Sequence, residues 1–253
     1  MVETNRRFMR TEALIGAEGV EKLQHASVMV VGLGAVGGYA LEALARAGIG
    51  RLILVDFDVF DETNINRQIL ALSSTVGRRK TEVARERVWE INPDCRIEVC
   101  DLFVNRETIP QLLRMPVDFV VDAIDSLNAK CCLIEALQQA GIPFVSSMGA
   151  ALKTDPSQIR LGSLAQTENC SLARMVRQRL RRRGVDLQQV LCVSSRELPR
   201  PVPDAKPQDE RERRPLGSLP TITAIFGLMI ANEVICRLAT TIKDCNKTPK
   251  GIS

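Results

Sequence analysis

The chain has 253 residues, 45% of them hydrophobic and 25% charged, and a formal net charge of +4. This composition is typical of a globular protein with one large domain, or with one domain and an appendage. The first residues lack the basic, apolar and small-residue pattern of a signal peptide. That argues against secretion and favours a cytoplasmic protein.

The eight cysteines form neither the pattern of a disulfide scaffold nor that of a structural zinc site. Structural zinc is usually bound by C-x-x-C pairs, and no two cysteines of this chain have that spacing. We therefore expect reduced thiols and no zinc. The cysteines lie at positions 95, 100, 131, 132, 170, 192, 236 and 245.

Up to about residue 150, apolar runs typical of buried strands alternate with segments of helical spacing. The predicted helices are 17–25, 35–48, 75–92 and 127–141. The predicted strands are 27–32, 51–56, 96–100, 117–125 and 142–147. This alternation predicts βαβ units with right-handed crossovers. The expected fold is therefore α/β, with a Rossmann-like, mostly parallel sheet and helices on both faces.

Beyond residue 150 the alternation weakens. Residues 158–165 and 188–194 are predicted to be further strands, and the charged, proline-rich segment at about 196–216 to be a mobile loop. We expect residues 1–150 to form a Rossmann-like, ligand-binding portion. Residues 151–253 would be a smaller mixed portion of the same domain, used for substrate binding and dimerisation.

The apolar stretch 222–239 is long enough to be a marginal membrane span. It contains Asn232, Glu233 and Arg237, and a charge near the middle of a span is costly. We therefore expect a buried core helix or a dimer helix, with no stable membrane insertion.

The first predicted strand leads into GLGAVG, which places Gly32, Gly34 and Gly37 in the G-x-G-x-x-G spacing before a helix. The first glycine permits a tight turn, the second lets a phosphate approach, and the third lets the helix pack on the strand. The helix N-terminus then favours an anion. Asp56 ends the second strand, where a carboxylate can accept hydrogen bonds from a ribose. These features predict a site for an adenine nucleotide.

The residues beyond this motif favour ATP over a nicotinamide cofactor. The single histidine, His25, precedes the first strand, on the wrong side of the sheet for hydride-transfer chemistry. A triphosphate needs positive side chains and a metal ion held by carboxylates. Arg67 and Lys80 can supply the charge, and Asp122 and Asp125 stand where the fourth predicted strand ends. ATP with Mg²⁺ is therefore expected, and a nicotinamide-dependent oxidoreductase is the less favoured alternative.

Two further segments of the chain are rich in polar or basic residues. In ETNINRQ (62–68), Asn64 precedes Arg67, and we expect Asn66 and Gln68 to hold the turn in shape without touching a ligand. Residues 174–183 contain six arginines in ten residues. That run suits either a phosphate-binding face or a solvated helix face.

These motifs, in this order, resemble the ubiquitin-activating-enzyme superfamily of the ThiF/MoeB/HesA type. The resemblance covers about residues 6–150 and joins a glycine loop, an Asp-x-Asp strand end, an Asn-x-Asn-Arg-Gln motif and a lysine. The matching stretches are RRFMR, VVGLGAVGGYALEALARAGIGRLILVDFDVFDETNINRQ, TVGRRKTE, INPDC and VVDAIDSLNAK. Members of this family adenylate a carboxylate with MgATP, release pyrophosphate, and work as homodimers or pseudo-dimers.

The resemblance implies a role for each matching residue. The phosphates and the ribose would be bound by Gly32, Gly34, Gly37, Asp56 and Asp58. The triphosphate would be contacted by Asn64, Arg67 and Lys80, of which the last two also steady charge as pyrophosphate leaves.

The resemblance also implies a catalytic metal and a residue from a second subunit. Asp125, with help from Asp122, would position Mg²⁺ and the adenylating centre. Either Arg7 or Arg10 would reach the ATP of the partner subunit in a homodimer.

Beyond residue 150 the chain is similar to the branch of tRNA threonylcarbamoyladenosine dehydratases, in the stretches 148–185, 190–197 and 220–234. This likeness implies adenylation of a carboxylate of threonylcarbamoyladenosine in tRNA, and then ring closure with net loss of water. The arginine run would grip the tRNA backbone. The segment RPLGSLPTITA is shorter than in that branch.

The alternative within the superfamily is an adenylyltransferase for the C-terminus of a ubiquitin-like or sulfur-carrier protein. Such members commonly carry the C-x-x-C zinc pairs that this chain lacks. A carrier or sulfur-relay protein remains a possible partner. Cys192 is either a nucleophile that forms a thioester or a structural thiol.

Overall fold

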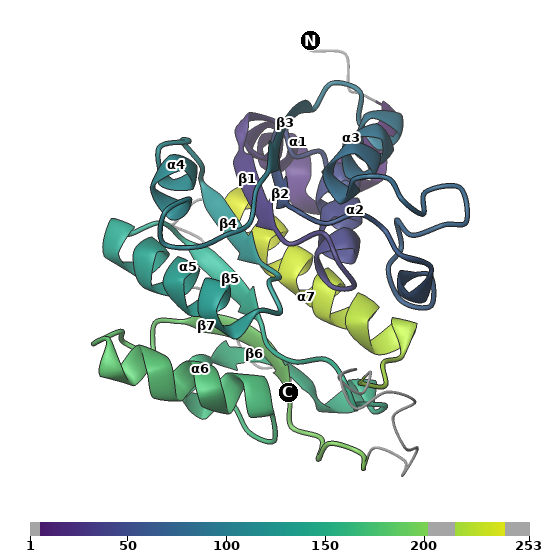
Figure 1. Cartoon of the computed structure of the whole chain (residues 1–253). Coiled ribbons are helices and arrows are strands. Elements are labelled where there is room, and N and C mark those ends of the chain that lie inside the picture. Colours follow the sequence, from purple (N-terminus) through teal and green to yellow (C-terminus); the bar gives the residue numbers. More distant parts are fainter. Residues whose placement is uncertain (1–5, 202–215, 241–253) are drawn as a thin grey trace, which may run out of the picture.

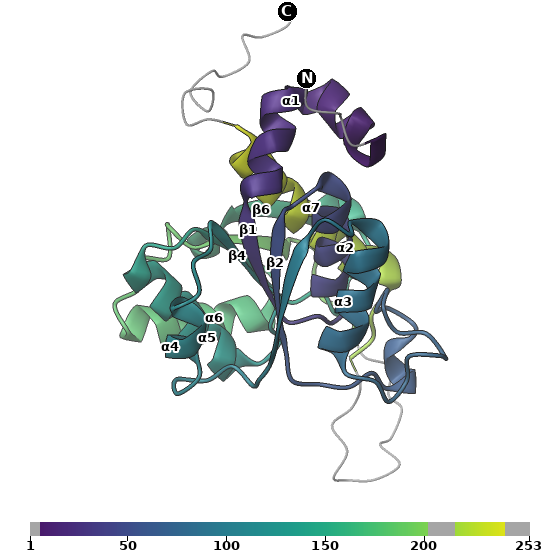
Figure 2. The same cartoon turned by 90° about the horizontal axis from the view of Figure 1, so that it is seen from above.

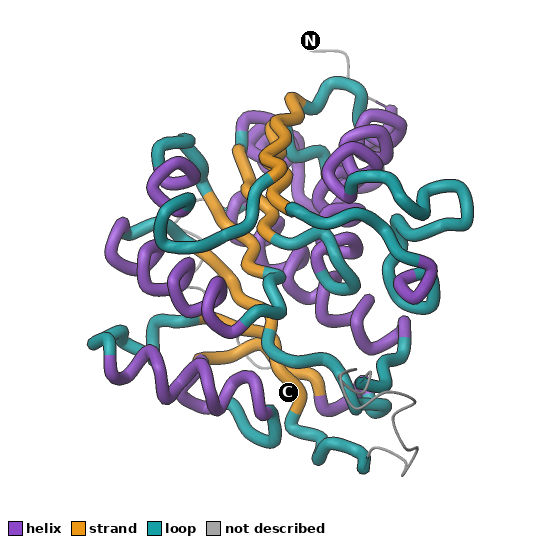
Figure 3. Tube along the Cα trace, in the orientation of Figure 1, coloured by secondary structure: helices purple, strands orange, loops and turns teal. Residues whose placement is uncertain are grey.

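The computed structural model describes residues 6–201 and 216–240. Its core is one seven-stranded sheet with helices on both faces (Figures 1 and 3). The strands are β1 (Ser27–Val31), β2 (Arg51–Asp56), β3 (Arg96–Asp101), β4 (Phe119–Asp122), β5 (Phe144–Ser147), β6 (Ile159–Ser163) and β7 (Leu191–Ser195). The α-helices are α1 (Met9–His25), α2 (Gly37–Ala47), α3 (Lys80–Ile91), α4 (Ile109–Leu113), α5 (Leu127–Ala140), α6 (Ser171–Arg182) and α7 (Pro220–Ala239). Short 3-10 turns are η1 (Arg6–Phe8), η2 (Glu62–Asn64), η3 (Pro156–Gln158) and η4 (Leu164–Gln166).

The strand order is β3-β2-β1-β4-β5-β7-β6. All neighbours are parallel except β6, which runs antiparallel to β7. The predicted α/β, mostly parallel Rossmann-like fold is therefore confirmed. From β1 the chain runs outward through β2 to β3, and it then crosses back to form β4 on the other side of β1. In open α/β sheets the ligand crevice lies at such a switch point, outside the carboxyl ends of the strands.

The sheet is buried on both faces, as the continuous apolar runs indicated. In β1, Val28 and Val30 belong to a core cluster under α2, α3 and α7. Met29 and Val31 point the other way, into a cluster under α4, α5 and α6. Figure 2 shows these two groups of helices on opposite sides of the strands. Because helices pack on both faces, the positions of the strand ends are fixed, and the residues that follow these ends are held in place.

The apolar helix α7 packs inside the molecule, as expected for a core helix. It meets the length and hydropathy of a membrane span, yet its residues Ile222, Phe226 and Ile230 are fully buried. A Cβ atom added at Gly227 would lie 2.4 Å from the carbonyl oxygen of Val36. This glycine therefore lets the backbones of α7 and α2 approach closely at the point where α2 begins.

Several predicted element boundaries differ from the structure, and one predicted segment lies mostly outside the described residues. The predicted helix 75–92 begins only at Lys80, because the chain before it pairs with the segment after β2. The predicted strand 117–125 ends at Asp122. Of the predicted loop at 196–216, residues 202–215 lie outside the described residues.

The helix predicted at 17–25 is longer and kinked. α1 begins at Met9 and bends at Gly16, whose backbone has φ 78° and ψ 164°. This conformation is open to glycine and strained for other residues. The first limb of α1 stands out from the body of the protein as an arm (Figure 2). The side chain of Leu14 on this arm is 86% exposed.

Candidate functional site

The three glycines of the loop after β1 serve different purposes. Gly32 has φ 90°, and a Cβ atom there would lie 2.8 Å from the carbonyl oxygen of Ala123. At Gly37 a Cβ atom would overlap the carbonyl oxygen of Gly32, at 1.8 Å. Both glycines are therefore required for backbone packing. A Cβ atom at Gly34 would meet only the side chain of Gln68 within 4 Å, so this is the glycine that faces open space.

The carboxylate of Asp56 is held where β2 ends. It is 8% exposed, and its Oδ2 accepts a hydrogen bond of 2.7 Å from the backbone N–H of Leu33 in the glycine loop. Its Oδ1 accepts one of 2.9 Å from the N–H of Asp58. These bonds fix the carboxylate beside the loop, where the predicted ribose contact requires it.

Asp58 and Lys80 are distant in sequence and adjacent in space. The Lys80 Nζ lies 3.2 Å from the Asp58 Oδ2, and the side chain of Lys80 is 8% exposed. Backbone pairing creates this contact, because the N–H of Phe60 donates to the carbonyl of Arg78 and the N–H of Lys80 to that of Asp58. The structure thus brings a buried ammonium group to the carboxyl edge of the sheet.

Asn64 and Arg67 lie in and just after the η2 turn. The carboxylate of Asp61 caps this turn, and Asn64 Oδ1 accepts a hydrogen bond of 3.3 Å from the N–H of Asp61. The Arg67 guanidinium donates to the Thr63 carbonyl oxygen at 2.8 Å and to Asn66 Oδ1 at 2.9 Å. Asn66 therefore orients Arg67, which agrees with its expected role in shaping the turn.

Asp122 is part of a buried ionic network at the end of β4. Its Oδ2 lies 2.7 Å from the Lys130 Nζ and accepts a hydrogen bond of 2.6 Å from the Ser146 hydroxyl. Its Oδ1 accepts a hydrogen bond of 3.1 Å from the N–H of Ile124. Asp122 and Lys130 are both 0% exposed. This geometry does not suit direct ligand contact, so we reassign Asp122 from nucleotide contact to the support of the β4–α5 loop.

Lys130 and Ser146 were missed as site-related residues. Lys130 lies in the first turns of α5, and Ser146 lies in β5, which is the neighbour of β4 in the sheet. The only sequence signal was a lysine on the apolar face of a predicted helix.

Asp125 is the carboxylate that remains accessible at this edge. It is exposed in the loop between β4 and α5, and Ser126 occupies the N-cap position of that helix. Within residues 6–201 and 216–240, its side chain has no hydrogen-bond or ion-pair partner. The loop lies against Gly32, because Ala123 is the residue that a Cβ atom there would strike. Asp125 is thus free to meet a ligand or a cation next to the glycine loop.

His25 and the two N-terminal arginines lie away from this edge. His25 ends α1, beside the amino end of β1, and is exposed. Arg7 is in η1 and Arg10 is on the first limb of α1, and both are exposed. Within one chain they do not join the other residues of the predicted site.

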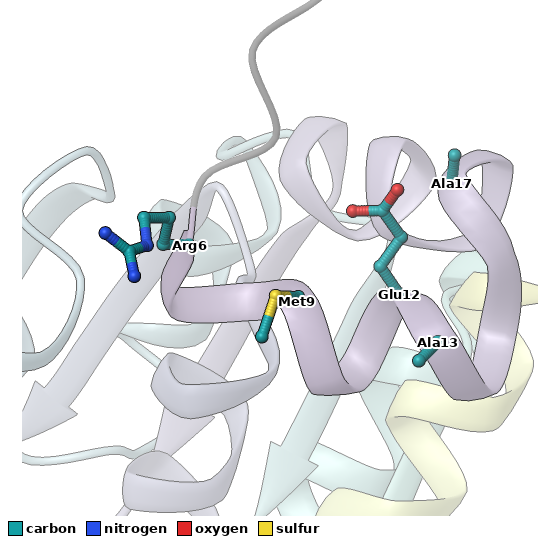
Figure 4. Close-up of a pocket in the computed structure, with 5 residues that line it drawn as sticks. All are labelled: Arg6, Met9, Glu12, Ala13 and Ala17. Atoms are coloured by element: carbon teal, nitrogen blue, oxygen red, sulfur yellow. The ribbon is translucent and has the colours of Figure 1, made fainter.

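A pocket lies in the bend of α1 and is separate from the candidate site. Its volume is about 530 Å³. Figure 4 shows its lining, which comprises Arg6, Met9, Glu12, Ala13 and Ala17. None of these belongs to the nucleotide-binding set, and the pocket is at the opposite end of β1 from the glycine loop. We therefore place the chemistry at the carboxyl edge of the sheet.

Cys192 is enclosed in the sheet. It is 0% exposed in β7, opposite Ser146 of β5. Burial raises the pKa of its thiol to about 12. A thiolate is the reactive form of cysteine, and a buried thiol of this kind is inert. We therefore assign Cys192 a packing role and no covalent step.

Native Cys192 is expected to resist alkylation by iodoacetamide at pH 7.5, because the thiol stays protonated at every pH well below 12. Peptide mass spectrometry of native and denatured protein measures this. Cys236, which is exposed, is the internal control. Fast native labelling of Cys192 would restore the thioester role.

The arginine run divides into anchored and exposed side chains. Arg177 donates to the carbonyl oxygen of Thr167 at 2.7 Å, and Arg183 lies 2.9 Å from Glu135. Arg179 is bonded to Asn128 of α5. The remaining three are exposed, namely Arg174, Arg181 and Arg182. Residues 171–182 form α6, whose first residues lie near the end of β5, because Gly149 N–H donates to Cys170 Sγ at 3.3 Å.

No group of three or more His, Cys, Asp or Glu side chains suited to a metal ion occurs in the part of the chain that the structure describes. The seven cysteines described there are all unpaired. A divalent cation at this site would therefore depend on one carboxylate and on ligand oxygens, as is usual for Mg²⁺ bound with phosphates.

The chain is similar to known proteins over most of its length. The tRNA threonylcarbamoyladenosine dehydratase of Bacillus subtilis is 36% identical over 245 residues, which cover 94% of this chain and 96% of that protein. That of Escherichia coli is 43% identical over 175 residues, which cover 69% and 65%. A crystal structure of the E. coli enzyme in complex with ATP matches with a TM-score of 0.86 and 36% identity, covering 96% of both chains. The ThiF family model matches residues 6–251, and this chain therefore belongs to the ThiF family.

Proposed function

We propose that this chain is an ATP-dependent enzyme that adenylates the carboxylate of threonylcarbamoyladenosine in tRNA and so drives its cyclisation by dehydration. The observation that carries this proposal is the set of charged side chains around the glycine loop. Asp56 ends β2, Lys80 begins α3, and Asp125 lies in the loop after β4, all at the carboxyl edge of the sheet. The likeness to dehydratases over nearly the whole chain supports tRNA as the substrate.

In the first step the substrate carboxylate attacks the α-phosphorus of ATP. A new P–O bond forms, the bond to the β-phosphate oxygen breaks, and pyrophosphate leaves with the electron pair. Arg67 and Lys80 are placed to neutralise the charge that develops on the departing phosphates. The Asn66 contact holds the Arg67 guanidinium in position before the reaction.

In the second step a nucleophile of the same substrate attacks the activated acyl carbon. The C–O bond to AMP breaks, AMP leaves with the electron pair, and the nucleophile loses its proton to solvent. The oxygen that dehydration removes is thus carried away on AMP. Because the nucleophile is already tethered to the acyl group, ring closure needs little help beyond orientation.

Asp125 fits a role in holding Mg²⁺ with the phosphates, because its carboxylate is accessible and unpaired within the described ranges. The cation would neutralise phosphate charge and orient the α-phosphorus. Asp58 is the other accessible carboxylate at this edge, but Lys80 already pairs with it.

We also propose that the enzyme acts as a homodimer. The arm formed by the first limb of α1 exposes Leu14 and Met9, at 86% and 59%. These two apolar side chains stand on an arm that projects from the body of the protein, and we take this as support for a contact with a second subunit. Arg10 or Arg7, carried on this arm, would then reach the ATP bound to the partner subunit.

The test combines the protein with ATP, Mg²⁺ and either bulk tRNA carrying threonylcarbamoyladenosine or a sulfur-carrier protein, and follows pyrophosphate. Release is expected with the modified tRNA, and mass spectrometry of its nucleosides should show loss of one water. Release only with the carrier protein would support the adenylyltransferase alternative. A wild-type protein that does not bind ATP would contradict the proposed function.

The exposed arginines of α6 are expected to bind the tRNA backbone. Replacing Arg174, Arg181 and Arg182 by alanine should weaken tRNA binding and reduce the salt slope of log Kd by about 2 to 3, since each phosphate contact contributes about 0.7 to 0.9. ATP affinity should not change.

Filter binding at several salt concentrations measures this slope. The matched control replaces three exposed arginines on α2 and α3, which are Arg46, Arg85 and Arg87. An equal loss in both triple variants would mean that net charge acts, rather than α6.

A further inference from the structure

Gln68 has a buried amide oxygen without a hydrogen-bond donor. The residue is 7% exposed, and its Oε1 makes no hydrogen bond. Within residues 6–201 and 216–240 only one other buried side-chain oxygen or nitrogen is in this condition, the Oδ1 of Asn92. Buried polar atoms are nearly always paired, so an unpaired one needs a specific explanation.

The side chain of Gln68 does not hold the turn in which it lies. The backbone does so, because the Gln68 N–H donates to the Asn64 carbonyl at 2.9 Å and the Gln68 carbonyl accepts from the N–H of Ala71 at 2.9 Å. The Asp61 cap completes the turn. The side-chain amide of Gln68 therefore contributes no hydrogen bond to the turn.

The amide instead lies over the middle glycine of the loop. Gln68 Nε2 would be 3.8 Å from a Cβ atom at Gly34, and that position meets no other atom within 4 Å. Gly34 is where a phosphate can approach the backbone. Gln68 is accordingly the side chain that borders the open space at Gly34. Its neighbour Arg67 is held by Thr63 and Asn66.

We propose that Gln68 is a nucleotide-contacting residue that binds the phosphates at Gly34 through its side-chain amide. Nε2 donates a hydrogen bond to a phosphate oxygen, and Oε1 accepts one from a water ordered with the phosphates. In the protein alone the oxygen has no donor, and the water ordered by the bound phosphates supplies one. A neutral amide here complements Arg67, because it donates a directional hydrogen bond to the phosphate without adding positive charge. The inference rests on the proposed function, since it requires a nucleotide at the glycine loop.

The test measures binding of ATP and of adenosine by calorimetry, with wild-type protein, Gln68→Met and Gln68→Glu. Methionine keeps the shape and removes both polar atoms, so ATP affinity should fall about tenfold. Adenosine affinity should change less than twofold, because adenosine has no phosphate. Glutamate should weaken ATP binding further, by placing a negative charge against the phosphates.

Thermal unfolding without nucleotide provides the second readout. Exchange of an unpaired buried amide for an apolar group of similar shape should leave Gln68→Met at least as stable as the wild type. A purely structural residue would give the opposite pattern, with lower stability and unchanged ATP affinity. That result, or an equal loss for ATP and adenosine, would overturn the inference.

Asn92→Leu is the matched control. It removes the other unpaired oxygen, near Ile49 at the amino end of β2, to whose carbonyl the Asn92 side chain donates at 3.2 Å. ATP affinity should remain within twofold of wild type. Failure of the wild type itself to bind ATP would defeat the proposed function. Normal binding by both the wild type and Gln68→Met would defeat only this inference.

Discussion

Replacement of Arg67 by alanine is expected to reduce ATP-dependent pyrophosphate release by roughly 10² to 10³-fold or more, with little change in unfolding temperature. Loss of one preorganised donor to a developing negative charge typically has an effect of this size. The fold should survive, because among the described residues the Arg67 side chain bonds to Thr63 and Asn66, both in the same surface turn. Arg67→Lys should recover part of the activity, since it keeps the charge but not the forked geometry.

Pyrophosphate release under saturating ATP and tRNA measures the effect, with circular dichroism as the check on folding. Arg46→Ala is the control, because Arg46 is an exposed arginine at the far end of α2, paired with Glu42 at 2.6 Å. A folded Arg67→Ala protein that releases pyrophosphate at the wild-type rate would remove Arg67 from the chemistry.

Replacement of Lys130 by methionine is expected to lower the free energy of unfolding by about 3 to 5 kcal/mol. The change leaves the Asp122 carboxylate buried without its cation, and breaking a buried pair on one side has this cost. The double variant Lys130→Met with Asp122→Asn should regain much of the loss. The asparagine carries no charge and can still accept the hydrogen bond from Ile124.

Urea unfolding of the wild type, both single variants and the double variant gives the coupling free energy. The surface pair Lys22–Glu18, in which the lysine is half-buried and the glutamate is exposed, provides the comparison, and Lys22→Met there should cost no more than about 0.5 kcal/mol. A loss below 1 kcal/mol in Lys130→Met would show that the Asp122 site relaxes or admits water. The structural account of Asp122 would then be wrong.

The central strands were predictable because their signals are local. Residues 51–56 were predicted as a strand with the bounds that the structure has, since an apolar run stands between Gly50 and the polar Asp56–Asp58 segment. The same holds for the glycine loop, whose spacing alone indicates a tight turn before a helix. The order of the strands was not predicted, because the right-handed βαβ rule fixes the hand of each crossover and leaves the order of strands open.

The start of α3 could not be read from the sequence. Residues 75–79 have acceptable helical composition, but Gly77 adopts φ 83°. The backbone of Phe60 donates a hydrogen bond to the carbonyl of Arg78 and accepts one from the N–H of Gly77. That pairing joins residues about twenty positions apart, and it is this tertiary contact that places Lys80 beside Asp58. Local propensity carries no information about such a contact.

The different environments of the two aspartates at the end of β4 and after it could likewise not be predicted from the sequence. Asp122 and Asp125 are three residues apart and chemically identical, yet one is fully buried and the other exposed. The difference arises because Lys130 and Ser146 meet Asp122 from two other elements. A sequence shows which residues can ionise, whereas the fold determines which of them water and ligands reach.

The contact between α7 and α2 has a consequence for biosynthesis. The glycine loop is made early, but the helix that follows it is covered by α7, which enters the core at Ile222, Phe226 and Ile230. While the ribosome is still translating the middle of the chain, α2 and α3 can cover part of that face, but the surface of α2, β5 and β7 that α7 covers stays exposed. Folding during synthesis generally proceeds from the N-terminus. The glycine loop of the nascent protein therefore cannot reach its final packing until α7 has left the exit tunnel. A protein truncated before α7 should be insoluble and inactive rather than partly active.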